Sequence, residues 1–307
     1  MNYIDLHTHT VHSDGTSTVE NSLTQAQKNN LSIFSVSDHN AVSAYEEIKA
    51  KRDLFDGKIL PGVEMSTTYR GEIVEVLGYG IDIAVMDKYI KENYMPLPQK
   101  RVEEAGLVAK ALAEKNVAMS KAFFEAMCHD PESLEGLHDL GCRPMFLEEM
   151  RKFPENERFF ESKEALYSMT RHRFTRDYLF NPDSTLYVDQ SALYPSLQQV
   201  IGFIHTAGGL AFLAHTYVYS ENIAASLDDI TDNYELDGLE CHYGTFTKAQ
   251  KSFLSGYCDK KGIFKSGGSD FHGLDMRPEN LMGLSAGEKI EQSLIDPWLD
   301  RVRSSLL

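Results

Sequence analysis

The feature that most constrains this chain is a recurring unit: a short apolar stretch, then histidines or carboxylates, then a stretch with helical spacing. Strands are expected at the start of residues 4–15 and at residues 31–37, 58–63, 72–80, 209–214, 236–239 and 262–266. Helices are expected near residues 18–28, 42–54, 195–206, 220–232, 246–261 and 289–305. Seven strands, most followed by a helix, favour an α/β barrel over two unrelated sheets. An open doubly wound sheet is the alternative.

Polar groups gather at the carboxyl ends of these expected strands. In an α/β barrel those ends converge on one mouth, where active sites lie. Because the pattern recurs on five separate strands, we expect one shared site. Its candidate residues are His7, His9, Asp38, His39, Glu64, His215, Asp270 and His272.

The first stretch indicates what such a site holds. Side chains alternate along a strand, so His7 and His9 point to the same face. Paired imidazoles suit a metal ion better than an apolar core. Asp14 on the following turn adds a further candidate ligand. His12, His205 and His242 are instead expected to be ordinary polar residues.

The whole set has too many ligands for a single tetrahedral zinc. It suits two or three divalent ions (Mn, Fe or Zn) about 3.5–4 Å apart, which would activate a bridging hydroxide and clamp phosphate oxygens. Phosphoester hydrolysis is therefore favoured, although the ligand set alone also permits amide hydrolysis.

Composition sets the broader limits. The chain has 307 residues and a formal net charge of −16, which argues against a general nucleic-acid-coating surface. The four cysteines are far apart in the sequence, which fits reduced thiols better than disulfides. Neither a leader nor a membrane span is visible, so we expect a cytoplasmic location. We expect no membrane partner and no stable protein partner. Residues 98–180 are rich in helix formers and read as an insertion between barrel parts 1–97 and 181–307.

Six ordered motifs carry a family resemblance. They are His7-Thr8-His9, Ser13-Asp14-Gly15, Ser37-Asp38-His39-Asn40, Gly62-Val63-Glu64, Ala214-His215 and the run from Gly267 to Gly273. Together they resemble the PHP (polymerase and histidinol phosphatase) metal-dependent phosphoesterases, over nearly the whole chain outside the insertion. The resemblance implies a distorted seven-stranded, TIM-like (β/α) barrel with up to three metal ions.

The chain is most similar to the group with a helical insertion and the run Leu77 to Asp82 after the fourth strand. That group hydrolyses nucleotides. By this resemblance, His7, His9, Glu64 and Asp270 would hold the first metal. Glu64 would bridge to a second metal held by His215, and Asp14, His39 and His272 would form the third site. Asp38 would orient an imidazole by a hydrogen bond.

Three positions depart from the family pattern. Glu75 replaces a histidine of the second metal site, where glutamate would still ligate and would shift preference toward harder ions such as manganese. Thr216 replaces a proline that normally follows the histidine. In the insertion, Arg171 matches a substrate-contacting arginine, whereas Arg173 replaces the histidine of that run.

The insertion also carries local positive charge. From Arg143 to Arg176 there are eight Arg or Lys residues against six Glu. A basic lid with Arg171 and Arg173 as substrate-binding residues would suit a second phosphate on the substrate. A solvated helical surface with ordinary ion pairs is the alternative.

We therefore expect a metal-dependent phosphoesterase acting on phosphomonoesters of small nucleotides, such as nucleoside 3′,5′-bisphosphates or AMP. Asp270 is the expected proton acceptor, and His215 or His272 would assist the leaving group. The alternatives are a histidinol-phosphate phosphatase, a 5′–3′ exonuclease on short RNA and, in another class, a non-catalytic binding domain.

Overall fold

The computed structural model describes residues 2–137 and 141–307, which form two compact units. Unit 1 comprises Met1–Thr67, Val74–Asn93 and Ser196–Leu307, and unit 2 comprises Thr68–Ile73 and Tyr94–Pro195. The segment expected as a helical insertion, residues 98–180, falls inside unit 2.

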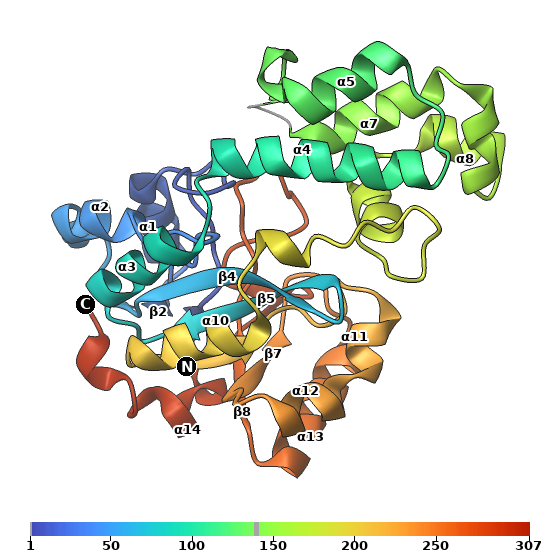
Figure 1. The fold of residues 1–307 in the computed structure, drawn as a ribbon. Coiled ribbons are helices and arrows are strands. Elements are labelled where there is room, and N and C mark those ends of the chain that lie inside the picture. Colours follow the sequence, from blue (N-terminus) through green and yellow to red (C-terminus); the bar gives the residue numbers. More distant parts are fainter. Residues whose placement is uncertain (1, 138–140) are drawn as a thin grey trace. The chain divides into compact units, whose positions relative to one another are not determined.

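Strands of unit 1 form a mixed α/β fold (Figure 1). A three-stranded parallel sheet contains β1 (Tyr3–Asp5), β2 (Leu31–Phe34) and β3 (Lys58–Ile59). A second sheet has the order β4-β5-β6-β7-β8, with bounds Gly62–Tyr69, Glu72–Tyr79, Leu210–Leu213, Gly238–His242 and Phe264–Gly267. In it β6, β7 and β8 run parallel, whereas β5 and β6 are antiparallel.

Isolated backbone bridges connect the two sheets. Thr8, just beyond β1, bridges Phe271, just beyond β8, and His39, beyond β2, bridges Glu64 within β4. The Leu6 N–H also donates to the Gly267 carbonyl at 3.2 Å. These bridges lie beside predicted site residues, so the backbone itself brings the segments that follow β1, β2 and β8 close to one another and to β4.

Helices of unit 1 pack beside the strands. Their bounds are α1 Val19–Lys28, α2 Ala44–Ala50, α3 Ile83–Asn93, α10 Leu197–Thr206, α11 Glu221–Ala225, α12 Leu227–Asn233, α13 Lys248–Lys261 and α14 Asp296–Leu299. Helix α1 starts at the Thr18 side-chain cap, and capping boxes at Ser196 and Thr247 start α10 and α13. A buried hydrophobic core contains residues of both sheets, such as Ile4 and Leu77, and in it Trp298 stacks on Tyr79 and contacts Phe212.

Some sequence-based boundaries were wrong. The predicted helix at 289–305 is instead β10 (Glu288–Lys289, paired with β9, Leu284–Ser285), two short 3-10 turns and α14. The reason is that the Gln292 N–H donates to the Asn2 carbonyl and that Pro297 lies in the first turn of a separate helix, α14, so one continuous helix over 289–305 is excluded. Glu64 was predicted to end a strand, but it is the third residue of the eight-residue β4.

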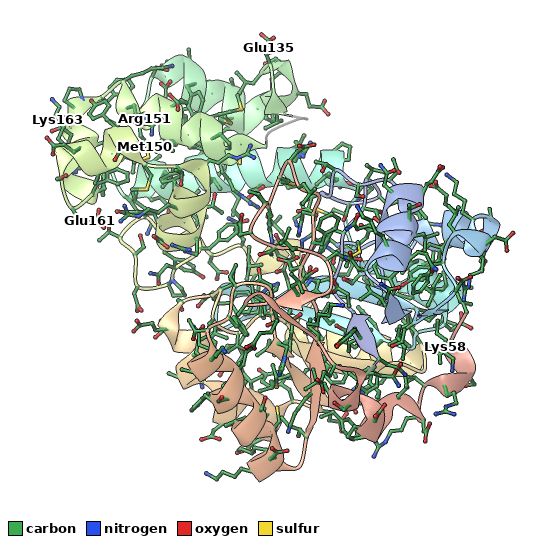
Figure 2. The ribbon with its side chains drawn as sticks, turned by 180° about the vertical axis from the view of Figure 1, so that it is seen from behind. Lys58, Glu135, Met150, Arg151, Glu161 and Lys163 are labelled. Atoms are coloured by element: carbon green, nitrogen blue, oxygen red, sulfur yellow. The ribbon has the colours of Figure 1, made fainter. Side chains whose placement is uncertain are left out.

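Unit 2 is helical, apart from the ends of β4 and β5. Its helices are α4 Leu97–Glu114, α5 Lys121–His129, α7 Cys142–Arg151, α8 Lys163–Ser168 and α9 Arg171–Arg173, followed by a π-helical turn over Phe174–Leu179. Figure 2 labels Met150, which is buried in the core of this unit, and Arg151, whose guanidinium donates to the carbonyls of Leu166 and Met169. In the described parts of the chain, none of the helices is long and apolar enough to cross a membrane.

Candidate metal-dependent active site

All nine residues predicted as metal ligands belong to unit 1, and their side chains converge. His7 and His9 follow β1, Asp14 lies on the next turn and His39 follows β2. Glu64 lies in β4 and Glu75 in β5, His215 follows β6, and Asp270 and His272 follow β8. Six strands therefore supply one cluster: β1, β2, β6 and β8 beyond their carboxyl ends, and β4 and β5 from within.

The first group within this cluster comprises His7, His9, Glu64 and Asp270, whose ligand atoms all lie within 4.8 Å of one another. The Nε2 atoms of His7 and His9 both lie 3.2 Å from Glu64 Oε2. His9 Nε2 is also 3.1 Å from Asp270 Oδ1. This is the set predicted for the first metal.

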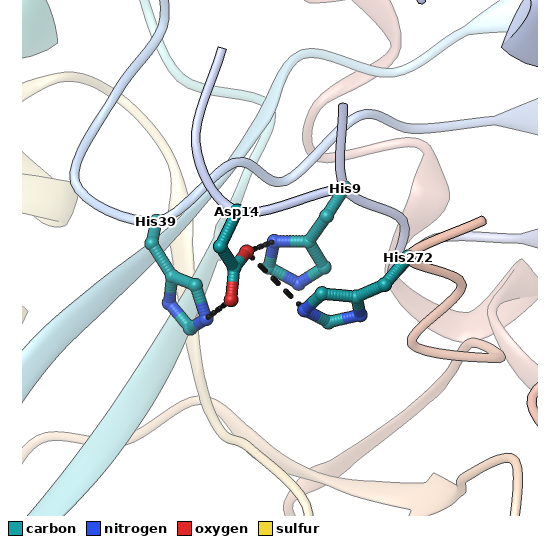
Figure 3. A group of neighbouring side chains, drawn as sticks. All are labelled: His9, Asp14, His39 and His272. Atoms are coloured by element: carbon teal, nitrogen blue, oxygen red, sulfur yellow. Dashed lines mark ion pairs between the residues drawn. The ribbon is translucent and has the colours of Figure 1, made fainter. Parts of the chain in front are cut away.

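A second group comprises His9, Asp14, His39 and His272 (Figure 3). Asp14 lies among the three rings: its Oδ1 is 3.5 Å from His9 Nδ1 and 3.2 Å from His272 Nε2, and its Oδ2 is 3.8 Å from His39 Nε2. The resemblance had placed only Asp14, His39 and His272 here. The structure adds His9, which two groups therefore share.

A third group comprises His39, Glu64 and Glu75. Next to it, His215 Nε2 lies 2.8 Å from Glu64 Oε1 and 3.3 Å from Glu75 Oε2. Glu75, which stands where relatives were expected to have histidine, thus points into the cluster with its carboxylate near both His215 and His39. Glu64 contributes to two groups, as expected of a bridging ligand.

The residues fit divalent cations. Among the buried side-chain atoms that form no hydrogen bond within the described ranges, six belong to predicted ligands: His7 Nε2, His9 Nε2, His39 Nδ1, Glu64 Oε2, His215 Nδ1 and His272 Nε2. Buried polar atoms left without partners are costly. Neutral imidazole nitrogens and carboxylate oxygens directed at common points are ligands for Zn, Fe and Mn.

The electrostatics also favour positive charge at the centre of the cluster. Burial alone would lower the pKa of His7, but the carboxylates of Glu64, Glu240 and Asp270 raise it well above its usual value. For His9, the hydrogen-bonding carboxylates outweigh burial and raise the pKa to about 10. Carboxylates that hold protons on imidazoles this strongly would likewise stabilise divalent cations in their place.

Glu240 is a residue of the site that the sequence analysis missed. Its fully buried carboxylate accepts a hydrogen bond from His7 Nδ1 at 2.9 Å and from the His215 backbone N–H at 2.8 Å. A carboxylate on Nδ1 fixes the ring so that Nε2 faces the cluster. The available signal was its place directly after the expected strand 236–239, beside Cys241 and His242, although in the structure it is the third residue of β7.

The predicted role of Asp38 was wrong. Its carboxylate contacts no imidazole in the described structure; it accepts hydrogen bonds from the Thr10 N–H and hydroxyl and from the Ser13 hydroxyl, at 2.6–2.7 Å. Because these donors lie on the turn that carries Asp14, Asp38 positions that ligand through the backbone.

None of the three histidines expected to be ordinary polar residues belongs to a ligand group of the described residues. His12 contacts Ser43 and Glu47, and His205 pairs with Asp237 at 2.8 Å near the opposite ends of the strands. His242 ends β7 and belongs to none of the three ligand groups.

In unit 2, Arg173 pairs with Glu161 and Asp177, and Arg171 is exposed at the start of α9. The predicted substrate-binding role of Arg171 and Arg173 stays a prediction.

This fold and this convergence of histidines and carboxylates define a metal-dependent hydrolase. The PHP domain profile matches residues 5–249, so the chain belongs to the PHP domain family, whose members include metal-dependent phosphoesterases. The chain is accordingly a metal-dependent phosphoesterase, a hydrolase of phosphoric ester bonds.

Individual relatives are distant in sequence but similar in length. A 3′,5′-nucleoside bisphosphate phosphatase from Chromobacterium violaceum is 26% identical over 276 residues, which cover 89% of this chain and 88% of the relative. The 5′–3′ exoribonuclease Rnm from Escherichia coli is 25% identical and covers 87% of this chain, with 84% of its own length matched.

Solved structures show the same fold. An amidohydrolase from Chromobacterium violaceum, solved with bound sulfate, superposes with a TM-score of 0.64 at 22% identity over 99% of this chain and 97% of its own. A metal-dependent phosphoesterase from Bifidobacterium adolescentis gives 0.61 at 21% identity, over 98% and 96%.

Proposed function

We propose that this chain removes phosphate from phosphomonoesters of small nucleotides, such as nucleoside 3′,5′-bisphosphates or AMP. The observation that carries the proposal is the set of three overlapping ligand groups, which share His9, His39 and Glu64. The bisphosphate phosphatase that matches nearly nine tenths of the chain supports the choice of substrate. We also infer that the two sheets form the distorted seven-stranded barrel of the family, with β3 and β4, which only Leu60 and Pro61 separate, counted as one strand. Isolated bridges that link Thr8 beyond β1 to Phe271 beyond β8, and His39 beyond β2 to Glu64 in β4, support this closure.

We propose that the nine predicted ligands hold two or three divalent ions (Mn, Fe or Zn), with Glu75 shifting preference toward manganese. When bound, such ions supply Lewis acidity: they make a water nucleophilic at neutral pH and stabilise charge on phosphoryl oxygens. The protein's contribution is to fix the ligands: Glu240 orients His7, and Asp38 holds the turn bearing Asp14.

Proton transfer is assigned to residues of the same cluster. We propose that Asp270 accepts the proton of the attacking water through Oδ1, the oxygen that faces His7 and His9. His215 or His272 would donate a proton to the departing alkoxide. No serine or cysteine nucleophile is required, so the reaction would proceed without a covalent enzyme intermediate.

A substrate screen tests the proposal. The metal-reconstituted protein is assayed for phosphate release from adenosine 3′,5′-bisphosphate, AMP and histidinol phosphate, and for trimming of 5′-phosphorylated short RNA. His9→Ala should abolish activity because it removes a ligand from two groups, whereas His205→Ala, on the far side of the strands, is the matched control. Hydrolysis of histidinol phosphate without hydrolysis of either nucleotide would contradict the proposed nucleotide substrates and favour a histidinol-phosphate phosphatase.

Short RNA is the second candidate substrate. It is favoured by the Escherichia coli relative, an exoribonuclease, which matches 87% of this chain. Release of mononucleotides from the 5′ end of the RNA, faster than phosphate release from bisphosphates, would favour this second function.

The basic segment of unit 2 has its own test. If Arg171 binds a second substrate phosphate, Arg171→Ala should raise KM far more for adenosine 3′,5′-bisphosphate than for AMP, because only the bisphosphate carries that group. Equal losses on both substrates would remove the lid hypothesis.

A further inference from the structure

Arg277 lies at the edge of the ligand cluster of unit 1 and has no role so far. Its guanidinium Nη1 donates to Asp270 Oδ2, and the Tyr243 hydroxyl donates to the same oxygen at 2.8 Å. The other oxygen of that carboxylate, Oδ1, lies 3.1 Å from His9 Nε2 and 3.4 Å from His7 Nε2. The two oxygens of Asp270 therefore have different partners: Oδ1 faces the ligand cluster, and Oδ2 accepts hydrogen bonds from Arg277 and Tyr243.

The segment that carries Arg277 is tied to the same strand end. Arg277 N–H donates to the Gly273 carbonyl at 3.2 Å, and Asn280 Nδ2 donates to the Asp270 carbonyl at 3.2 Å. Asp270 itself adopts a left-handed backbone conformation (φ +56°), which is uncommon for a residue other than glycine and needs such support. Hydrogen bonds of the segment 273–280 thus keep Arg277 close to the Asp270 carboxylate.

The rest of the guanidinium remains available. The Arg277 side chain is 32% exposed, whereas that of Asp270 is 2% exposed. A guanidinium has five N–H donors. In the part of the chain that the structure describes, the hydrogen bond to Asp270 is the only one that its side chain makes. Donors therefore remain at the solvent side of a buried ligand.

The negative charge of the cluster indicates what the free donors of Arg277 could bind. Five carboxylates meet in this region: Asp14, Glu64, Glu75, Glu240 and Asp270. Among their ion pairs within the described residues, the pair with Arg277 is the only one whose cation is an arginine or lysine. A phosphate dianion approaching these carboxylates would be repelled unless positive charge accompanies it, and guanidinium binds phosphate oxygens bidentately.

We propose that Arg277 is a substrate-binding residue, which holds Asp270 with one nitrogen and binds a phosphoryl oxygen of the phosphomonoester with the others. The inference rests on the proposed phosphatase function and deepens it. Arg277 would also retain inorganic phosphate, the product, in the same position.

Three variants separate this role from mere support of Asp270. Arg277→Ala removes the cation, Arg277→Lys keeps the charge without the fork of donors, and Tyr243→Phe removes the other anchor of Asp270 Oδ2 without changing charge. Each metal-loaded variant is titrated with inorganic phosphate by calorimetry, and its metal content is measured. Kinetics with AMP give kcat and KM separately.

We expect Arg277→Ala to weaken phosphate binding and raise KM about ten-fold or more, with metal content unchanged. Arg277→Lys should recover part of the affinity, and Tyr243→Phe should bind phosphate as the wild type does. Unchanged phosphate affinity in Arg277→Ala would overturn the inference. So would equal losses of phosphate binding and metal in Arg277→Ala and Tyr243→Phe, since both would then act through Asp270 alone.

The two proposals fail separately. If no nucleotide is hydrolysed but phosphate still binds in an Arg277-dependent manner, the substrate proposal fails and this inference stands. If AMP is hydrolysed normally by Arg277→Ala with unchanged KM, this inference fails and the phosphatase stands.

Discussion

Replacing Glu240 by glutamine should weaken metal binding although Glu240 is not a predicted metal ligand. Its two oxygens accept from two donors, His7 Nδ1 at 2.9 Å and the His215 backbone N–H at 2.8 Å. Glutamine offers one acceptor oxygen and an NH₂ group, so one of these donors would face another donor. Both contacts are fully buried, and water cannot replace the lost acceptor without rearrangement.

The consequence for the metal follows from the tautomer of His7. If the new NH₂ group faces His7, the ring must accept there with Nδ1, which places the proton on Nε2, the atom that faces Glu64 and Asp270. A protonated Nε2 cannot ligate a metal. Loss of such orienting partners costs about 10–100-fold in metal affinity, which corresponds to about 1.4–2.8 kcal/mol.

The assay is a competition titration of Mn²⁺ or Zn²⁺ into metal-free protein against a chelator of known affinity. Glu288→Gln is the control, because this half-exposed glutamate pairs with Lys248 and Lys251 outside the cluster. Thermal unfolding of the metal-free proteins shows whether the variants fold. A folded Glu240→Gln protein with wild-type metal affinity would refute the orienting role.

Three further outcomes follow. Trp298→Ala should lower the free energy of unfolding by about 3–5 kcal/mol in urea titrations, because the buried ring contacts Tyr79 and Phe212; a loss below about 1 kcal/mol would contradict this core. The hydrogen bond to Asp237 raises the pKa of His205 above its usual value, so the pair's contribution, less than about 1 kcal/mol, should be complete below about pH 6.5 and lost as pH rises through the raised pKa. The difference in free energy of unfolding between the wild type and His205→Ala should therefore be larger at pH 5.5 than at pH 9. A difference that increases with pH would contradict this prediction. Removing metal with a chelator should lower Tm, and restoring an ion to 100 times its Kd should return about 2.7 kcal/mol of stability; an unchanged Tm would show that no ion binds the folded state.

From the sequence, the residues of the candidate site could be predicted more completely than the boundaries and pairing of the strands. Polar residues after apolar stretches identify strand ends directly, and parallel strand ends meet whatever the exact lengths of the strands. That is why His7, Glu64, His215 and Asp270 were expected together, and their side chains do lie close to one another even though Glu64 lies inside β4 and not at its end. The sharing of His9 between two groups depends on ring orientation, which spacing along the chain does not determine.

What sequence reasoning missed depends on contacts between distant segments. Glu240 follows the expected strand 236–239, as the ligands follow theirs, but it lies 233 residues from His7 in the chain, so only the folded structure shows that the two side chains are in contact. Asp38 was misassigned because an aspartate beside a histidine can orient a ring or hold a turn, and the Thr10 and Ser13 donors decide between the two. The helix predicted over 289–305 does not form because the backbone of Gln292 pairs with that of Asn2, near the start of the chain.

Metal stoichiometry tests the central claim most directly, namely that residues from six strands share one cluster of ions. Wild-type protein, His9→Ala and His205→Ala are stripped, reconstituted with Mn²⁺, Fe²⁺ or Zn²⁺, freed of excess ion and analysed by elemental mass spectrometry. The account predicts two to three ions per chain in the wild type and in His205→Ala, and a loss of at least one in folded His9→Ala, since that ring belongs to two groups. A wild-type protein that retains no ion, or a His9→Ala protein that retains them all with unchanged affinity, would contradict it.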